Sequence, residues 1–152
     1  MVEIRQATMA DSADVFLWRN DAVTREMSRN TALIPEDEHQ QWFRESLERD
    51  DRAFFIGETE GEKIGMVRFD RRDGDDWEVN INLNPALRGR KLSLGLLKAA
   101  IGEFRGQRNP GRILATIRTV NVPSQKIFSQ AGFQLAGQDG DFEYHELPLR
   151  GD

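Results

Sequence analysis

Apolar and polar residues alternate in several short runs of this chain, which is the pattern of half-buried β-strands. The clearest run, Trp77–Leu83, places four apolar side chains on one face and Glu78, Asn80 and Asn82 on the other. Similar runs predict strands over 2–7, 53–58, 63–70, 112–117, 133–136 and 142–149. The turn Glu60-Gly61-Glu62 between two of these runs predicts a hairpin.

Helical segments separate the strands. Apolar residues recur at the 3.6-residue spacing of an amphipathic helix from Leu92 to Phe104. Prolines at the first helical position predict two more helices, starting at Pro35 and at Pro123. A further helix is expected after Thr8, running toward Asn20 with an apolar side of Ala13, Phe16 and Leu17, and a short helical turn is expected at 24–27.

The order of elements, β-α-α-β-β-β-α-β-α-β-β, predicts a sheet domain of the α/β or α+β class. The connection from strand 77–83 through helix 92–104 to strand 112–117 is a crossover, so these two strands are expected to be parallel. No linker or repeat interrupts the chain, and a single domain over residues 1–152 is expected.

Composition narrows the class of protein. The net charge of -5 argues against a nucleic-acid binder, and no apolar run approaches the length of a membrane span. No cysteine is present, and His39 and His145 show no ligand spacing, so neither a thiolate nor a metal site is expected. The N-terminus lacks the apolar stretch of a signal peptide, which favours a cytoplasmic location.

One segment stands out chemically. A basic turn follows strand 77–83 and leads directly into helix 92–104. The first N–H groups of a helix lack intrahelical partners and lie at the positive end of its dipole, so this turn is a candidate site for a compact anion such as a phosphate. The alternative is a solvated basic turn with no ligand. The residues of the turn are Arg88, Gly89, Arg90, Lys91, Leu92 and Ser93.

With this turn and a second motif, the chain resembles the GCN5-related N-acetyltransferases over nearly all its length. The turn matches the family's acetyl-CoA motif, Arg/Gln-x-x-Gly-x-Gly/Ala. The segment from Asn121 to Phe133 matches a pattern of Asn-x-x-Ser followed by Gly-Phe. Lys91 stands where the family usually has glycine, and it is expected to keep an ordinary backbone conformation and offer its ammonium to the phosphate.

The resemblance implies a fold and a cofactor. The fold is a mixed, mostly antiparallel sheet of six to seven strands, splayed between the fourth and fifth, with about four flanking helices. Acetyl-CoA is the implied cofactor, with no metal. Its predicted contacts are the turn 88–93, the backbone amides around Ile81, Asn82 and Leu83, and the side chains of Asn121, Ser124 and Phe128. The alternative for Asn121 is a helix N-cap.

Acetyl transfer from a thioester to an amine requires a neutral amine, a polarised thioester carbonyl and protonation of the leaving thiolate. In the absence of cysteine, direct attack by the amine in a ternary complex is expected. Glu78 is the candidate base, the alternative being a solvated polar strand face. Relatives often place a tyrosine where Phe128 stands, so the acid is sought in Tyr144 or Ser124.

The N-terminal part resembles the amino-sugar and ribosomal-protein branch of the family. The resemblance implies a nucleotide-linked amino sugar or another small amine as acceptor, and a homodimer is possible. The predicted acceptor contacts are Trp18, Arg19, Asn20, His39 and Asn80. The aromatic residues could instead belong to the core and His39 could be structural. Two other functions stay open: acetylation of protein N-termini, and a non-catalytic acyl-CoA-binding module.

Overall fold

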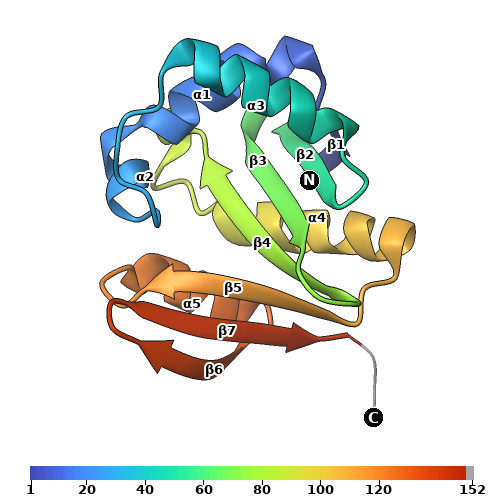
Figure 1. Cartoon of the computed structure of the whole chain (residues 1–152), viewed down its shortest axis with the longest axis vertical. Coiled ribbons are helices and arrows are strands. Elements are labelled where there is room, and N and C mark those ends of the chain that lie inside the picture. The colour runs from blue at the N-terminus through green and yellow to red at the C-terminus, as the bar shows by residue number, and fades with distance from the viewer. Residues whose placement is uncertain (150–152) are drawn as a thin grey trace.

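Seven strands form one mixed sheet in the computed structural model, which describes residues 1–149 (Figure 1). The strand order is β1-β2-β3-β4-β5-β7-β6. The bounds are β1 (Glu3–Gln6), β2 (Arg52–Thr59), β3 (Glu62–Arg71), β4 (Asp76–Leu83), β5 (Arg112–Arg118), β6 (Gln134–Asp139) and β7 (Phe142–Pro148). The predicted hairpin is confirmed: β2 and β3 are joined at Glu60 and Gly61, whose positive φ values of 52° and 78° suit a two-residue hairpin turn.

Strands β4 and β5 are the one parallel pair in the described sheet, as the crossover predicts. They pair over only three positions, from Asp76 opposite Arg112 to Glu78 opposite Leu114. Beyond Glu78 the strands separate, and Figure 1 shows the wedge that opens between them. The mixed sheet splayed between its fourth and fifth strands is therefore confirmed.

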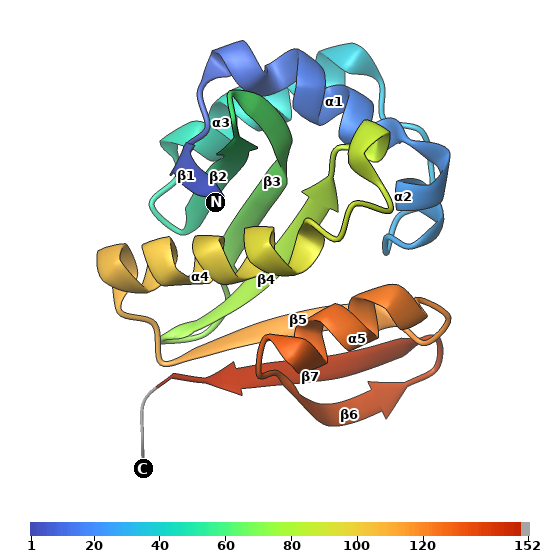
Figure 2. The ribbon, with the colours of Figure 1, turned by 180° about the vertical axis from the view of Figure 1, so that it is seen from behind.

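Five α-helices cover the sheet within residues 1–149: α1 (Ser12–Asn20), α2 (Ala22–Glu26), α3 (Glu36–Glu48), α4 (Ser93–Arg108) and α5 (Val122–Gln130). Figure 2 shows α4 and α5 running across one face of the sheet. The expected helical turn at 24–27 is the short helix α2.

The two faces of the sheet bury different cores. Helix α4 packs on the larger one, where the rings of Phe69 and Phe104 stack with centroids 4.1 Å apart. Helices α1 and α3 cover the smaller one, which contains Val15, Trp18 and Phe43. As predicted, Trp77, Val79, Ile81 and Leu83 share one face of β4, and this is the face that α4 covers. Glu78, Asn80 and Asn82 lie on the side of α1 and α3.

The predicted apolar side of the first helix is wrong for Ala13 and Leu17, whereas Phe16 is half-buried with its ring centroid 5.3 Å from that of His39. Helix α1 buries Val15 and Trp18, whereas Leu17 is 64% exposed and Ala13 is also exposed. Apolar residues occur all round this short helix, so periodicity did not define one face. The orientation follows from the fit of Val15 and Trp18 into the core with Phe43.

A buried ionic cluster anchors the start of α1 to the sheet. The Asp11 carboxylate is 1% exposed and accepts two hydrogen bonds of 2.8 Å from Arg5 of β1. Lys63 of β3 lies 2.8 Å from the same carboxylate, and the Thr8 N–H donates to it at 2.9 Å. The Asp11 side chain thus joins the start of the chain to β3, which is distant in sequence.

Across residues 1–149, no helix has the length and apolar character needed to cross a bilayer. The described chain also holds no cluster of three or more metal-ligating side chains. The expectation of one domain over 1–152 includes three C-terminal residues that lie outside the described range.

Candidate functional site

A cavity of about 1080 Å³ occupies the wedge where β4 and β5 separate. One wall is β4 from Glu78 to Leu83, and the opposite wall includes Thr116 and Ile117 of β5. The N-terminal ends of α4 and α5 and residues 23–34 around α2 complete the lining. The cavity therefore draws on both halves of the sheet and on most of its helices.

The β5-facing edge of β4 is open along this wall. Ladder pairing with β5 ends at Glu78, whereas pairing with β3 continues to Leu83. The backbone groups of β4 that point away from β3 therefore meet the cavity instead of a neighbouring strand. Gly65 of β3 lets the two strands approach closely here, because a Cβ on it would lie 2.6 Å from the Asn82 carbonyl oxygen.

The basic turn leads into an uncapped helix at the cavity. No side chain caps the N-terminus of α4, and Ser93 and Leu94 of its first turn line the wall. The N–H groups of that turn are thus available to an anion. Gly89 adopts a φ of 82° and Lys91 a φ of 59°. The expectation of an ordinary conformation for Lys91 is wrong: the turn requires a left-handed residue at the glycine position, and the lysine accepts it.

The two arginines of the turn behave differently. Arg88 lines the cavity, where it is ion-paired with Asp21 and donates to Thr24 at 3.2 Å. This hydrogen bond from Arg88 is the main cause that lowers the pKa of Asp21. Arg90 is not part of the wall; it is 63% exposed and lies 3.7 Å from Glu62. Of the turn's arginines, only Arg88 faces the cavity.

The second motif forms the start of α5. The Asn121 side chain accepts a hydrogen bond of 3.2 Å from the Ser124 N–H. Asn121 is therefore the N-cap of α5, which was the alternative to a cofactor contact. Asn121 and Ser124 both line the cavity. Phe128 is 4% exposed, packs edge-on against Phe133, and contributes the apolar part of the same wall.

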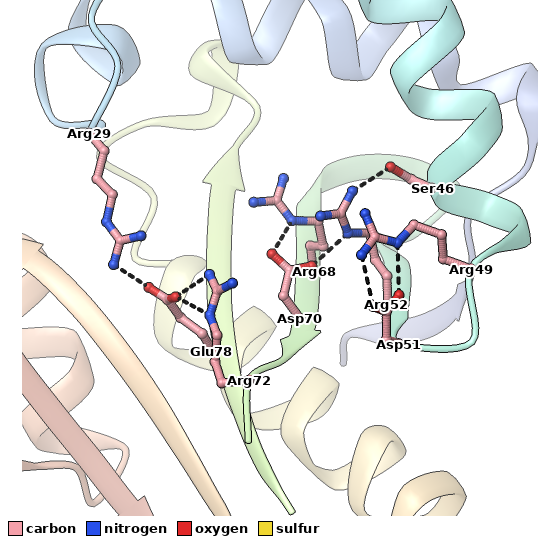
Figure 3. Close-up of polar contacts among 9 residues, drawn as sticks. All are labelled: Arg29, Ser46, Arg49, Asp51, Arg52, Arg68, Asp70, Arg72 and Glu78. Atoms are coloured by element: carbon pink, nitrogen blue, oxygen red, sulfur yellow. Dashed lines mark hydrogen bonds and ion pairs between the residues drawn. The ribbon is translucent and has the colours of Figure 1, made fainter. Parts of the chain in front are cut away.

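Glu78 is buried, not solvated. Its side chain is 8% exposed and lies at the point where β4 and β5 part. Arg29 donates to Oε2 at 2.9 Å, and Arg72 donates to Oε1 through Nε at 2.8 Å (Figure 3). Arg29 also donates to Thr116 of β5 at 2.7 Å, so it bridges the two separating strands. The alternative of a solvated strand face is wrong for Glu78.

Tyr144 lies apart from the cavity. It belongs to β7, is 39% exposed, and pairs with Thr116 of β5. Thr116 lines the wall, but Tyr144, one strand further out, does not. Of the two predicted acids, Ser124 is at the cavity and Tyr144 is outside it.

The predicted acceptor residues are divided between cavity and core. Arg19 and Asn80 line the cavity. Trp18 and His39 are 4% and 1% exposed and lie in the core beneath it. Asn20 exchanges two hydrogen bonds of 2.8 Å with the backbone of Ile34 and so holds the loop before α3. For Trp18 and His39 the alternative is therefore correct: Trp18 belongs to the core and His39 is buried within it.

Three further arginines line the cavity and were not predicted from the sequence: Arg29, Arg68 and Arg72. Arg68 stands opposite Asn80 in the β3–β4 ladder, and periodicity alone could have placed its side chain on the face of Glu78. Arg29 and Arg72 lie outside regular strands and helices, where no pattern predicts direction.

A sheet that opens between two parallel strands, with two helix N-termini at the opening, defines an enzyme scaffold that can hold a phosphate-bearing cofactor. The acetyltransferase (GNAT) domain model matches residues 2–134. The chain belongs to this family and is an acyltransferase of the N-acetyltransferase type. No curated protein sequence matches it significantly.

Solved structures share the fold at low identity. Spermidine N-acetyltransferase from Vibrio cholerae, in complex with CoA and spermine, has a TM-score of 0.87 at 15% identity, covering 97% of this chain and 95% of that one. Ribosomal-protein-alanine N-acetyltransferase from Brucella melitensis has 0.81 at 23%, covering 97% and 99%. Aminoglycoside acetyltransferase AAC(6')-Ib, in complex with coenzyme A and kanamycin, has 0.84 at 17%, covering 97% and 95%.

Proposed function

We propose that the cavity binds acetyl-CoA and transfers its acetyl group to a small primary amine by direct attack in a ternary complex. Residues 1–152 would act as one N-acetyltransferase domain. The observation that carries the proposal is the opening of the sheet beyond Glu78, flanked by the uncapped N-terminus of α4. It provides an anion site and an open strand edge in one cavity.

In this proposal the cofactor lies along the wedge. Its pyrophosphate meets the first turn of α4, with Arg88 and Lys91 beside it. The pantetheine arm follows the open edge of β4 at Ile81, Asn82 and Leu83, and passes Asn121, Ser124 and Phe128 on α5. Backbone N–H groups of that edge would polarise the thioester carbonyl.

The reaction requires a base near the amine. The amine nitrogen attacks the thioester carbon, the C–S bond breaks, and the nitrogen loses a proton as the thiolate gains one. Glu78 is the proposed acceptor of the amine proton, directly or through a water molecule. Arg29 would have to release Oε2 first, and its 58% exposed side chain can then return to water while Arg72 keeps its hydrogen bond to Oε1. Ser124 is the proposed partner of the thiolate, through water.

The acceptor is proposed to be a small amine such as a nucleotide-linked amino sugar. Its position would be the part of the cavity formed by Arg19, Asn80 and the α2 region. The similar structures solved with spermine and with kanamycin hold small amines, which supports this class of acceptor for the fold.

Replacing Arg88 by alanine tests the cofactor site. A charge-assisted hydrogen bond to phosphate would be lost, but Arg88 must first leave Asp21, so we expect a loss of about 1–2 kcal/mol, or roughly five- to thirtyfold in Kd for acetyl-CoA. Calorimetric titration measures it. Arg105→Ala, an exposed arginine of α4 outside this cavity, is the control. An unchanged Kd would remove Arg88 from the site.

A further inference from the structure

Positive charge dominates the acceptor part of the cavity. Glu78 is the one carboxylate in the described wall. Four arginines line the wall on the side of α1–α3: Arg19, Arg29, Arg68 and Arg72. Glu78 is shared by Arg29 and Arg72. These four arginines are distinct from Arg88 and Lys91 of the basic turn, so the phosphates of the cofactor do not account for them.

Arg19 is the least compensated of the four. Within residues 1–149 it has no carboxylate partner, and its hydrogen bond goes to His39 Nδ1 at 2.9 Å. His39 Nε2 lies 2.9 Å from the Ser12 carbonyl oxygen, so Nε2 donates there and Nδ1 accepts from Arg19. Burial is the main cause that lowers the pKa of His39, opposed by the Ser12 bond, and Arg19 lowers it further. A neutral imidazole thus positions Arg19 without balancing its charge.

Arg68 adds to this excess. Trp42 is faced by three guanidinium groups, those of Arg19 at 3.9 Å, Arg68 at 5.2 Å and Arg52 at 5.4 Å from its ring centroid. Asp70 is the carboxylate among them; it accepts from Arg52 at 2.7 Å and from Arg68 Nε at 3.1 Å. In Figure 3 the terminal nitrogens of Arg68 point away from Asp70.

The neighbouring positive charges also affect the pKa of Arg19. Burial, together with the positive charges of Arg68 and Arg52, lowers the pKa of Arg19 to about 10. The guanidinium still carries its proton at neutral pH. An anion between Arg19 and Arg68 would relieve this repulsion and receive their free N–H groups in a fork geometry suited to carboxylate or phosphate.

We infer that the acceptor amine carries an oxyanion, a carboxylate or a phosphate, which Arg19 and Arg68 bind while the amine is directed toward Glu78. The inference rests on the proposed function and names its class of acceptor. Polycationic amines without an acidic group, such as spermine, would face like charge here. Arg19 and Arg68 are then the residues that determine acceptor specificity, and His39 is a positioning residue for Arg19.

The test uses matched amines that differ in their oxyanion. Glucosamine 6-phosphate is compared with glucosamine, and 4-aminobutyrate with 4-aminobutyramide, so that the two pairs separate phosphate from carboxylate. Each amine is titrated into the CoA-saturated protein by calorimetry, and thiol release from acetyl-CoA is measured in parallel. In at least one pair the anionic member is expected to bind about ten- to hundredfold more tightly and to show the higher kcat/KM.

Substitutions identify the side chains that cause the preference for the anionic amine. Arg19→Gln and Arg68→Gln are expected to reduce it at least about tenfold. Arg44→Gln, which removes an exposed arginine of α3 outside the cavity, should leave it unchanged. His39→Gln should weaken binding of the anionic member more than that of its neutral partner, which a purely structural role would not do.

Three results would overturn the inference: equal binding of both members in each pair, preference for the neutral members, or no binding of either anion. These results are distinct from failure of the proposed function, which would appear as absent CoA binding in the same titrations. In that case the pairs are titrated into the free protein, and the anion site is still judged by the same criteria.

Discussion

Replacing Glu78 by glutamine is expected to lower kcat by about 10²- to 10³-fold while leaving the Kd for acetyl-CoA unchanged. Glutamine keeps the size of the side chain but cannot accept the amine proton. Glu78 lies at the last paired position of β4, directly beside the wedge, with its carboxylate 8% exposed. A group at that position meets both the open edge of β4 and the acceptor part of the cavity.

The control for this change is Glu146→Gln. Glu146 is a half-buried glutamate of β7 that accepts from Arg112 at 2.8 Å, and it does not line the cavity. Its loss removes an ion pair of the same kind without touching the proposed site, so kcat should stay within about twofold. If Glu78→Gln retained kcat under conditions in which chemistry limits the rate, Glu78 would not be the base.

The second large effect concerns stability. Asp11→Asn is expected to lower the free energy of unfolding by roughly 2–3 kcal/mol and Tm by about 5–10 °C. The change leaves Arg5 and Lys63 without their shared carboxylate, which is 1% exposed. The loss is smaller than for a fully buried pair because Arg5 and Lys63 keep partial access to water, at 36% and 26% exposure. Chemical denaturation of both proteins measures it.

The pH dependence of this effect has a definite sign. Burial alone would raise the pKa of Asp11, but hydrogen bonds from Arg5 and Lys63 outweigh it and hold the pKa well below its ordinary value. The stabilisation is therefore present above the unfolded-state pKa of about 3.9 and is lost as the pH falls toward the folded-state value. The difference between wild type and Asp11→Asn should shrink below about pH 4.

Asp14→Asn is the matched control for Asp11. Asp14 also pairs with Lys63, at 2.9 Å, but its side chain is 46% exposed. An exposed pair of this kind contributes about 0–1 kcal/mol. Equal destabilisation by the two substitutions would mean that burial of Asp11 has no part in the effect.

Periodicity predicted the fold where segments were long and one-sided. The alternation of Trp77–Leu83 and the 3.6-residue spacing in α4 identified a strand and the crossover helix that follows it, and such a connection predicts that β4 and β5 are parallel. Helix α1 failed because apolar residues surround it. Only the packing of Val15 and Trp18 against the rest of the chain selected its buried face.

The sequence predicted the backbone segments that form the site better than the charged side chains that line it. The turn before α4 and the start of α5 occur in the two motifs, and Arg88, Asn121 and Ser124 of these motifs line the cavity. Arg29 and Arg72 reach Glu78 from loops, and sequence patterns carry no direction for a loop side chain. The left-handed Lys91 also depended on the turn geometry, which overrode the preference of the residue.

The central claim is that this cavity transfers an acetyl group from acetyl-CoA to an amine. The most direct measurement is thiol release from acetyl-CoA, with the acetylated amine quantified by mass spectrometry, over a panel that includes the matched amines above. The account predicts amine-dependent thiol release equal to the amount of acetylated amine formed, and a decrease of about 10²- to 10³-fold in the Glu78→Gln protein. Tight binding of acetyl-CoA with no amine-dependent release would contradict it and would define a non-catalytic acyl-CoA-binding module.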